Sequence, residues 1–235
     1  MKENFKLINV LATGSNGLLG KCFRKIEKKH PSLNFCFVNS KELNIGQKSH
    51  MQKFFKNKSF DFVINCAAYT NVEKAEKEPE KAFLVNAEGV KNLAEVCKQY
   101  NSTLIHISTD YVFDGHKNTP YTEGDVPNPI NEYGKSKLAG ENYIQEILDK
   151  YFIIRTSWLY SEFGHNFFKI ILKKTEIEKI SGKIVTLRLK NIDNYVTFAR
   201  RPRYSVLGKE KVKSTFDLNI PDWKKSLRNL YSIIQ

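Results

Sequence analysis

The sequence predicts an α/β fold, a doubly wound parallel sheet in which short buried strands alternate with longer helices. Short runs that are apolar throughout are typical of strands covered on both faces; they lie at 7–12, 35–38, 62–67, 104–108 and 151–155. Stretches with helical periodicity separate them, near 18–29, 47–57, 79–99 and 134–149. Strands joined by helical crossovers form such a sheet.

Length and composition indicate one folded unit with an anionic partner. The 235 residues fit one medium domain, or one domain with a small appendage, and a hydrophobic fraction of 41% excludes a disordered chain. The formal charge of +13 favours nucleotides or phosphates as partners. Because the lysines are spread along the chain, a solvated surface explains them better than a nucleic-acid site, and we expect no nucleic-acid partner.

Cysteine and histidine usage indicates neither disulfides nor a metal. The four cysteines have no C-x-x-C spacing and the five histidines no H-x-x-x-H pairing, so we expect free thiols and no metal site. The apolar run at the N-terminus is too short for a signal peptide, and no later stretch is long enough to span a bilayer. We therefore expect a cytoplasmic protein without a membrane partner.

A glycine-rich loop follows the first predicted strand. T-G-S-N-G-L-L-G places Gly14, Gly17 and Gly20 between this strand and the first helix, with Ser15, Asn16 and Leu18 among them. Such a loop allows a tight turn and a close approach of a pyrophosphate to the backbone at a helix N-terminus. The alternative is an ordinary strand-to-helix turn. The position at the start of a strand–helix unit favours dinucleotide binding.

The end of the second strand indicates which dinucleotide. The spacing of the loop is G-x-x-G-x-x-G, and V-N-S-K lacks the acidic residue that would bind the ribose 2′-hydroxyl. Ser40 and Lys41 are instead suited to a 2′-phosphate. This favours NADPH and leaves NADH open; the alternative interpretation of Lys41 is one more surface lysine.

A hydroxyl-rich strand end and a tyrosine–lysine pair are the catalytic candidates. Thr109 follows the fourth strand, and Tyr133 and Lys137 open the next helix, one turn apart and about 5–6 Å between Cβ atoms. An ammonium at that distance lowers the pKa of a tyrosine, which predicts that Tyr133 donates a proton to a carbonyl oxygen that receives a hydride. Thr109 is expected to donate a second hydrogen bond to that oxygen.

Several stretches of the sequence match one known family. They include G-S-N-G-L-L-G (14–20), N-C-A-A-Y-T-N-V (65–72), S-T-D-Y-V-F-D-G (108–115), the stretch 121–141 around Y-G-K-S-K, R-T-S-W-L-Y (155–160) and A-R-R-P-R-Y-S-V-L (199–207). With these stretches the chain resembles the dTDP-4-dehydrorhamnose reductases, a family of extended short-chain dehydrogenase/reductases with a Rossmann-like domain. The resemblance implies NADPH-dependent reduction of the C4 ketone of a dTDP-4-dehydro-6-deoxy sugar, for cell-surface polysaccharide precursors. It leaves a homodimer open.

The resemblance also implies roles for individual residues. Thr109, Tyr133 and Lys137 match the catalytic triad, and Lys137 would also hold the nicotinamide ribose. Ala67, Ala68 and Tyr69 match the segment along the cofactor, and Thr70, Val72 and Trp158 match positions that face the sugar. Tyr111 stands where related dehydratases have a catalytic glutamate, which disfavours dehydration.

The resemblance stops at 174–198, where the family has a longer substrate region with a D-Q-x-G-x-P-T segment. We therefore expect an NAD(P)-binding domain at 1–160 and a shortened substrate-binding region at 161–235. Two alternatives stay open: a reductase or epimerase of another nucleotide sugar, and an NADP-binding regulatory homologue without catalysis. The retained triad favours an enzyme, and the missing region favours the regulatory homologue.

Overall fold

A five-stranded parallel sheet forms the centre of the protein. The computed structural model describes residues 7–180 and 197–234. The strands lie in the order β2-β1-β3-β4-β5, with these bounds: β1 Ile8–Thr13, β2 Leu33–Phe37, β3 Phe62–Asn65, β4 Thr103–Thr109 and β5 Tyr151–Thr156. The predicted fold class is confirmed, and each strand lies within two residues of its predicted position.

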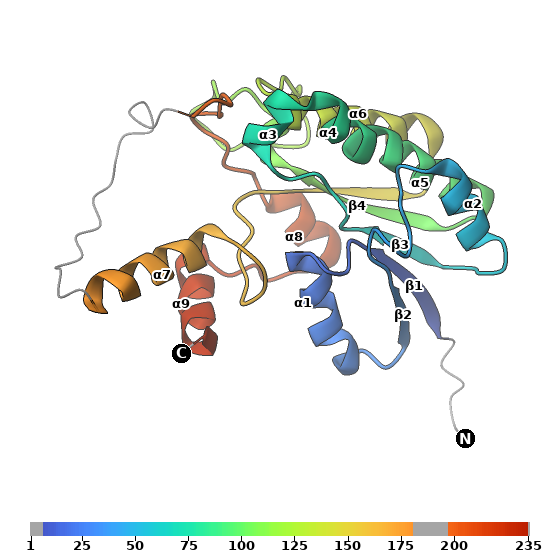
Figure 1. Cartoon of the computed structure of the whole chain (residues 1–235), viewed down its shortest axis with the longest axis horizontal. Coiled ribbons are helices and arrows are strands. Elements are labelled where there is room, and N and C mark those ends of the chain that lie inside the picture. Colours follow the sequence, from blue (N-terminus) through green and yellow to red (C-terminus); the bar gives the residue numbers. More distant parts are fainter. Residues whose placement is uncertain (1–6, 181–196, 235) are drawn as a thin grey trace.

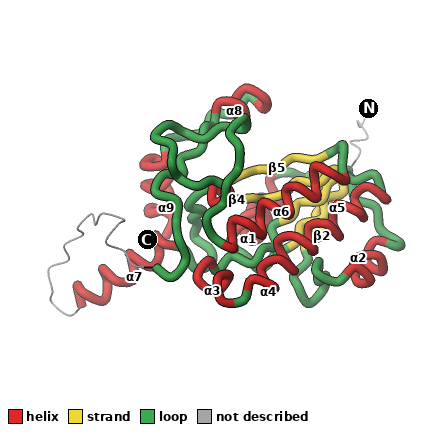
Figure 2. Tube along the Cα trace, turned by 90° about the horizontal axis from the view of Figure 1, so that it is seen from above, coloured by secondary structure: helices red, strands yellow, loops and turns green. Residues whose placement is uncertain are grey.

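Helices cover both faces of this sheet. Their bounds are α1 Leu18–Ile26, α2 Lys48–Phe55, α3 Val72–Lys77, α4 Pro79–Phe83, α5 Gly89–Gln99, α6 Glu132–Ile147, α7 Phe167–Ile180, α8 Glu210–Phe216 and α9 Trp223–Ile234. Helices α2 to α6 lie along one face and α1 lies on the other (Figure 1). From above, α5 and α6 lie over the strands that they cover (Figure 2). Helices α7 and α9 contact each other beside the sheet through the rings of Phe168 and Tyr231, 6.4 Å apart.

The main hydrophobic core lies between the sheet and the helices α2, α5 and α6. It includes Leu11, Phe55, Val63, Leu93 and Ile144, all fully buried. Burying a side chain of this size contributes about 1.5–3 kcal/mol. This core holds the strand ends, which carry the polar residues described below, in fixed positions.

Three parts of the helical prediction are corrected. The stretch at 79–99 is divided by a π-helical turn at Leu84–Glu88, between α4 and α5. Helix α3 was not predicted; its N-cap is Asn71, whose side chain accepts a hydrogen bond from the backbone N–H of Lys74 at 2.9 Å. Helices α7 and α8 were not predicted either, because their segments lack a clear apolar periodicity. The sequence also allows a strand at 184–189, which lies outside the described residues.

A buried ion pair joins three elements below the carboxyl end of the sheet. Glu141 of α6 is fully buried and accepts hydrogen bonds from Ser108 of β4 at 2.5 Å and from Nη2 of Arg155 of β5 at 2.6 Å. The Arg155 guanidinium also lies over the ring of Phe113, 5.0 Å from its centroid. The pair fixes α6 against both strands.

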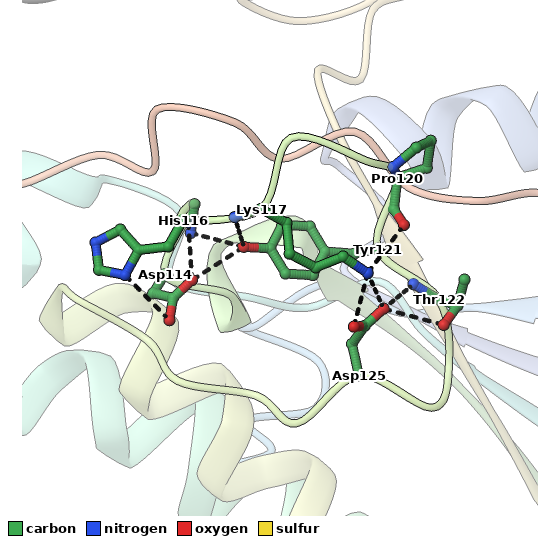
Figure 3. Close-up of polar contacts among 8 residues, drawn as sticks. Asp114, His116, Lys117, Pro120, Tyr121, Thr122 and Asp125 are labelled. Carbon is green, nitrogen blue, oxygen red and sulfur yellow. Dashed lines mark hydrogen bonds and ion pairs between the residues drawn. The ribbon is translucent and has the colours of Figure 1, made fainter.

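The C-terminal segment docks on the loop that follows β4. Tyr121 donates its backbone N–H to Val206 at 2.8 Å, and its carbonyl accepts from the N–H of Gly208 at 2.7 Å. The Tyr121 hydroxyl accepts from the backbone N–H of Gly115 and donates to Asp114, while Lys117 and Asp125 form an ion pair at 2.7 Å (Figure 3). This network gives the loop a fixed shape, to which residues 206–208 attach.

The Arg155–Glu141 pair makes a testable prediction. Replacing Arg155 with Met leaves the Glu141 carboxylate buried without its cation, and we expect the free energy of unfolding to fall by about 3–5 kcal/mol. The matched control is Lys135→Met, which removes an ion pair with Glu132 at the surface and should cost less than about 1 kcal/mol. Urea denaturation measures both. Equal losses in the two variants would contradict a structural role for the buried pair.

Candidate functional site

The glycine loop connects β1 to α1 at the carboxyl edge of the sheet. Gly14 has a φ of +65°, and a Cβ there would lie 2.6 Å from the backbone of Cys66 and Ala67. A Cβ on Gly20 would lie 2.6 Å from the carbonyl oxygen of Gly14. Both positions therefore require glycine. The loop is also tied to the end of β2, because the Ser15 N–H donates to the Val38 carbonyl at 3.1 Å.

The loop has the features of an anion site. The Ser15 hydroxyl is buried and has no hydrogen-bond partner among the described residues. Gly17, the N-cap of α1, has an extended backbone, and no acidic residue lies in the first turn of the helix. Unpaired N–H groups and the helix dipole favour a phosphate at such a position. The residues present therefore fit the pyrophosphate of a dinucleotide.

The segment after β3 passes close to this loop and is tied to α6. The Tyr69 N–H donates to the side chain of Asn86 at 2.8 Å, and the Asn86 amide donates to the Tyr69 carbonyl and to the Ser136 hydroxyl at 2.9 and 3.0 Å. The Tyr69 hydroxyl donates to Glu78 at 2.5 Å. The backbone of Ala67 to Tyr69 is therefore held at the edge of the sheet beside Gly14.

The predicted 2′-phosphate residues lie at the end of β2. Ser40 and Lys41 are exposed there. The Asn39 side chain accepts from the backbone N–H of Lys41 at 2.8 Å, and the Glu42 carboxylate accepts from the N–H of Asn39 at 2.8 Å. The Lys41 side chain is thus an exposed cation just after β2, and the Arg24 guanidinium, over the Phe37 ring at 4.4 Å, is another at this end of the strand.

Tyr133 and Lys137 lie in the first turns of α6, as predicted. The Asn131 side chain caps this helix by accepting from the Gly134 N–H at 2.7 Å, and its amide donates to the Arg200 carbonyl at 2.8 Å. The ring of Tyr133 is partly buried, with the Tyr111 ring packed edge-on against it, 5.9 Å between centroids. Helix α6 thus brings Tyr133 to the end of β4.

The predicted effect of Lys137 on Tyr133 is wrong. Burial raises the pKa of Tyr133 to about 12; the nearby Asp110 and Tyr111 also raise it, and a hydrogen bond with Thr109 lowers it. Lys137 does not contribute because its side chain turns into the protein, where Nζ donates to the Ile107 carbonyl at 2.6 Å and lies 3.1 Å from Nε2 of His106. Tyr133 is therefore protonated at every ordinary pH.

Lys137 has an unusual environment. Its side chain is 2% exposed. Burial lowers the pKa of Lys137 to about 8, against the opposing effects of Glu141 and Cys66. The lysine therefore changes charge near neutral pH.

Thr109 also has a different bonding pattern from the predicted one. Its hydroxyl donates to Asp110 Oδ1 at 3.1 Å and accepts from the Tyr111 N–H at 3.1 Å. A hydroxyl has one proton, and Thr109 donates it to Asp110. Thr109 therefore accepts the hydrogen bond from the Tyr133 hydroxyl. Burial raises the pKa of Asp110, against the hydrogen bonds from Ser205, Ser157 and Thr109. Thr109 thus orients the Tyr133 hydroxyl.

The positions predicted to face a sugar lie around this edge. Thr70 is exposed, and Val72 is the first residue of α3 and is partly buried. Trp158 follows β5 with a φ of +53° and is 65% exposed, and its ring contacts Phe167 of α7 edge-on at 5.3 Å. Their contact with a sugar stays a prediction.

Residues from the C-terminal segment also border the site. The Glu73 carboxylate of α3 accepts from the N–H groups of Phe198 and Ala199 at 3.0 and 3.1 Å and pairs with Arg201 at 2.8 Å. Arg201 in turn bonds to Tyr111, and it lowers the pKa of Glu73. The A-R-R-P stretch therefore closes one side of the site.

Sequence reasoning assigned no role to several buried polar residues of this site: Asn65, Asn86, His106, Asp110 and Asn131. A signal was present for two of them, because Asn65 and His106 interrupt apolar strand runs, where a buried polar side chain needs a partner.

Two cavities lie away from this edge of the sheet. One of about 400 Å³ is lined by residues of α7 and α9, including Phe168, Trp223 and Tyr231, and one of about 310 Å³ borders α2. Within residues 7–180 and 197–234, no group of three His, Cys, Asp or Glu side chains is placed to hold a metal. In the same ranges no helix has the length and apolarity to cross a bilayer.

Several known proteins with similar sequences are dTDP-4-dehydrorhamnose reductases. A dTDP-4-dehydrorhamnose reductase of Aggregatibacter actinomycetemcomitans is 37% identical over 178 residues, covering 76% of this chain and 60% of that protein. The chain therefore spans less than two thirds of that relative. A reductase of the same name from Sinorhizobium fredii is 29% identical over 287 positions, covering 95% and 96% of the two proteins. Because 287 exceeds the 235 residues of this chain, that relative carries residues without a counterpart here.

Solved structures of dTDP-4-dehydrorhamnose reductases have a fold similar to that of this chain. The dTDP-4-dehydrorhamnose reductase of Bacillus anthracis, determined in complex with NADP, has a TM-score of 0.86 at 28% identity and covers 97% of this chain and 99% of its own. The Clostridium acetobutylicum protein of that name has a TM-score of 0.87 at 32% identity, covering 97% and 100%. The family described as RmlD substrate binding domain matches residues 8–186. The predicted resemblance is confirmed, and the chain belongs to this family.

Proposed function

We propose that this protein is an NADPH-dependent reductase of the C4 ketone of a dTDP-4-dehydro-6-deoxy sugar, which converts dTDP-4-dehydrorhamnose to dTDP-L-rhamnose. The observation that carries the proposal is the hydrogen bond between Tyr133 and Thr109 at the sheet edge that also holds the glycine loop. Membership of the RmlD family and the names of the relatives support it.

The chain has the residues to hold the cofactor. The loop Gly14–Gly20 with Ser15, Asn16 and Leu18 would bind the pyrophosphate, and Ala67, Ala68 and Tyr69 would lie along the nicotinamide half. NADPH, when bound, supplies the hydride that adds to C4. The complex of the Bacillus anthracis reductase with NADP supports this choice of cofactor.

Tyr133 supplies the proton. As hydride adds to C4, negative charge develops on the ketone oxygen, and the Tyr133 O–H donates its proton to that oxygen. The C4–O double bond becomes a single bond, one C–H and one O–H bond form, and Tyr133 is left as a phenolate that regains a proton from solvent. Lys137 would hold the nicotinamide ribose. Thr109 directs the hydroxyl of Tyr133.

The division of the chain follows from the same proposal. Residues 1–160 would form the cofactor domain and 161–235 a shortened substrate region. Trp158, near the boundary, and Thr70 and Val72 would face the sugar. The extra positions of the Sinorhizobium relative support a missing internal block, which we place in 174–198.

A second function is favoured by one observation. Trp158, which matches a position that faces the sugar, is 65% exposed. This exposure fits a protein that binds NADP without closing over a sugar, as a regulatory homologue would. Reduction or epimerisation of another nucleotide sugar is the remaining alternative.

Replacing Tyr133 with Phe tests the proposed reaction. NADPH consumption with dTDP-4-dehydro-6-deoxy-L-mannose should fall by about a factor of 100 or more, because the proton donor is lost. NADPH affinity should stay within about twofold, which shows that the site is intact. A wild-type rate no higher than that of the variant would exclude the reductase, and NADPH binding without turnover of any nucleotide sugar would favour the regulatory homologue.

Replacing Lys41 with Ala tests the preference for NADPH. The 2′-phosphate would lose one ion pair at an exposed site, so we expect about a fivefold to tenfold weaker binding of NADPH. NADH affinity should not change. Lys98→Ala is the control, because Lys98 lies at the end of α5 that leads into the opposite edge of the sheet. Isothermal titration calorimetry gives the dissociation constants, and an equal loss for both nucleotides would contradict the assignment.

A further inference from the structure

The C-terminal segment reaches Tyr133 through a chain of three side chains. The Glu73 carboxylate of α3 accepts a hydrogen bond from Nη2 of Arg201 at 2.8 Å. Arg201 also donates to the hydroxyl of Tyr111. The ring of Tyr111 packs edge-on against the ring of Tyr133, with 5.9 Å between the centroids and 75° between the ring planes. Residues from three distant parts of the sequence therefore meet beside the proposed proton donor.

The backbone of Tyr111 is held on both sides. Its N–H donates to the Thr109 hydroxyl at 3.1 Å. Its carbonyl oxygen lies so close to Gly134, the residue after Tyr133, that this glycine has no room for a Cβ. The side chain of Tyr111 is half-buried, and Arg201 holds its hydroxyl end. The bond to Arg201 therefore determines where the Tyr111 ring lies against Tyr133.

Tyr133 needs a second contact of this kind. Its hydrogen bond with Thr109 holds the phenol oxygen but does not set the plane of the ring. Edge-on packing favours particular angles between two rings, so a fixed Tyr111 ring sets the plane of Tyr133. The placement matters because a shift of about 1 Å in a reacting group can cost a factor of about 100 in rate.

The ion pair is not needed to fasten the C-terminal segment. The Glu73 carboxylate also accepts from the N–H groups of Phe198 and Ala199, at 3.0 and 3.1 Å. The Asn131 amide donates to the Arg200 carbonyl at 2.8 Å. Because these contacts are made by the backbone of the segment, they do not depend on the guanidinium. The guanidinium therefore acts mainly on the tyrosine to which it donates.

We propose that Arg201 is a positioning residue for Tyr133. Held by Glu73, it fixes the ring of Tyr111, and this ring keeps the Tyr133 hydroxyl aimed at the place of the reacting ketone. Arg201 thus acts on the proton-transfer step and not on the affinity for NADPH or for the nucleotide sugar. The effect on turnover rests on the proposed reductase, whereas the effect on the Tyr133 ring does not.

The first experiment needs neither cofactor nor turnover. The full chain is labelled with ¹³C in the tyrosine rings, and the NMR signals of Tyr111 and Tyr133 are those absent from Tyr111→Phe and Tyr133→Phe. In Arg201→Met we expect the signals of both rings to shift. Tyr111 shifts because its hydroxyl loses a donor, and Tyr133 shifts because the ring beside it moves. A shift of Tyr111 alone, or of neither ring, would overturn the proposal.

Arg200→Met is the matched control. It makes the same change in the adjacent residue, whose side chain is exposed and whose contact with Asn131 uses the backbone carbonyl. Both tyrosine signals should stay in place, and the two variants should melt close to each other, because each keeps the backbone contacts of the segment. Ring shifts as large in Arg200→Met would indicate a general loosening and would refute the role of Arg201.

Tyr111→Phe provides a second route to the same result. It removes only the oxygen atom that Arg201 holds, so it tests the proposal even if Arg201→Met does not fold. The Tyr133 ring signals should shift in this variant as well. Unchanged Tyr133 signals in Tyr111→Phe would count against the proposal.

The second experiment measures turnover of dTDP-4-dehydro-6-deoxy-L-mannose with NADPH. In Arg201→Met we expect kcat to fall about tenfold, with KM for both substrates unchanged. Tyr111→Phe should show the same loss, and the double variant should lose no more than either single variant, because both changes break one link. Losses that multiply in the double variant, or a raised KM in place of a lowered kcat, would contradict the coupling.

The two experiments separate this role from the proposed reductase. Shifts of both rings without turnover of the nucleotide sugar would defeat the reductase alone. Turnover with a wild-type kcat in Arg201→Met would defeat the role of Arg201 alone.

Discussion

A buried lysine is the constraint on which the carboxyl edge of this protein depends. A charge-bearing group that is 2% exposed needs partners, because an unpaired one would cost several kcal/mol. Lys137 finds them in the Ile107 carbonyl and in His106. The next turn of α6 is held in a similar way, because the buried Glu141 carboxylate pairs with Arg155 and accepts a hydrogen bond from Ser108. Helix α6 therefore sits on β4 in one register, and Tyr133 is carried to the end of that strand.

The spacing of Tyr133 and Lys137 predicted that the two side chains interact, but in the structure they have different partners. One turn of helix brings Tyr133 and Lys137 to the same face, but Lys137 turns inward and Tyr133 bonds to Thr109. Tyr133 is thereby kept protonated and is ready to donate. The pKa of Lys137 depends instead on its own burial and on Glu141 and Cys66. The pKa values of Tyr133 and Lys137 are thus set by different neighbours.

Much of the fold was predictable from local sequence. The five apolar runs predicted the strands, and the glycine loop and the Tyr133–Lys137 spacing fell on the expected elements. Local periodicity could not predict α3, whose start depends on the Asn71 cap, or the π-helical turn before Gly89. Nor could it predict the contact of Arg201 with Glu73, which joins residues far apart in the sequence. The direction of the pKa shift of Tyr133 was mispredicted because it depends on burial and on where a flexible lysine points, and neither is encoded in the spacing of two residues. Asn65 and His106 were visible as polar residues in apolar strands, but the hydrogen bond between them depends on the register of β3 with β4.

The central claim is that the shortened chain still brings a ketone to the site beside Tyr133. The most direct measurement is a single turnover with NADPH deuterated at C4 of the nicotinamide and dTDP-4-dehydro-6-deoxy-L-mannose, followed by NMR of the sugar. The account predicts deuterium at C4 of the product and none elsewhere in the sugar. Saturating NADPH binding with no deuterium at C4 would contradict it.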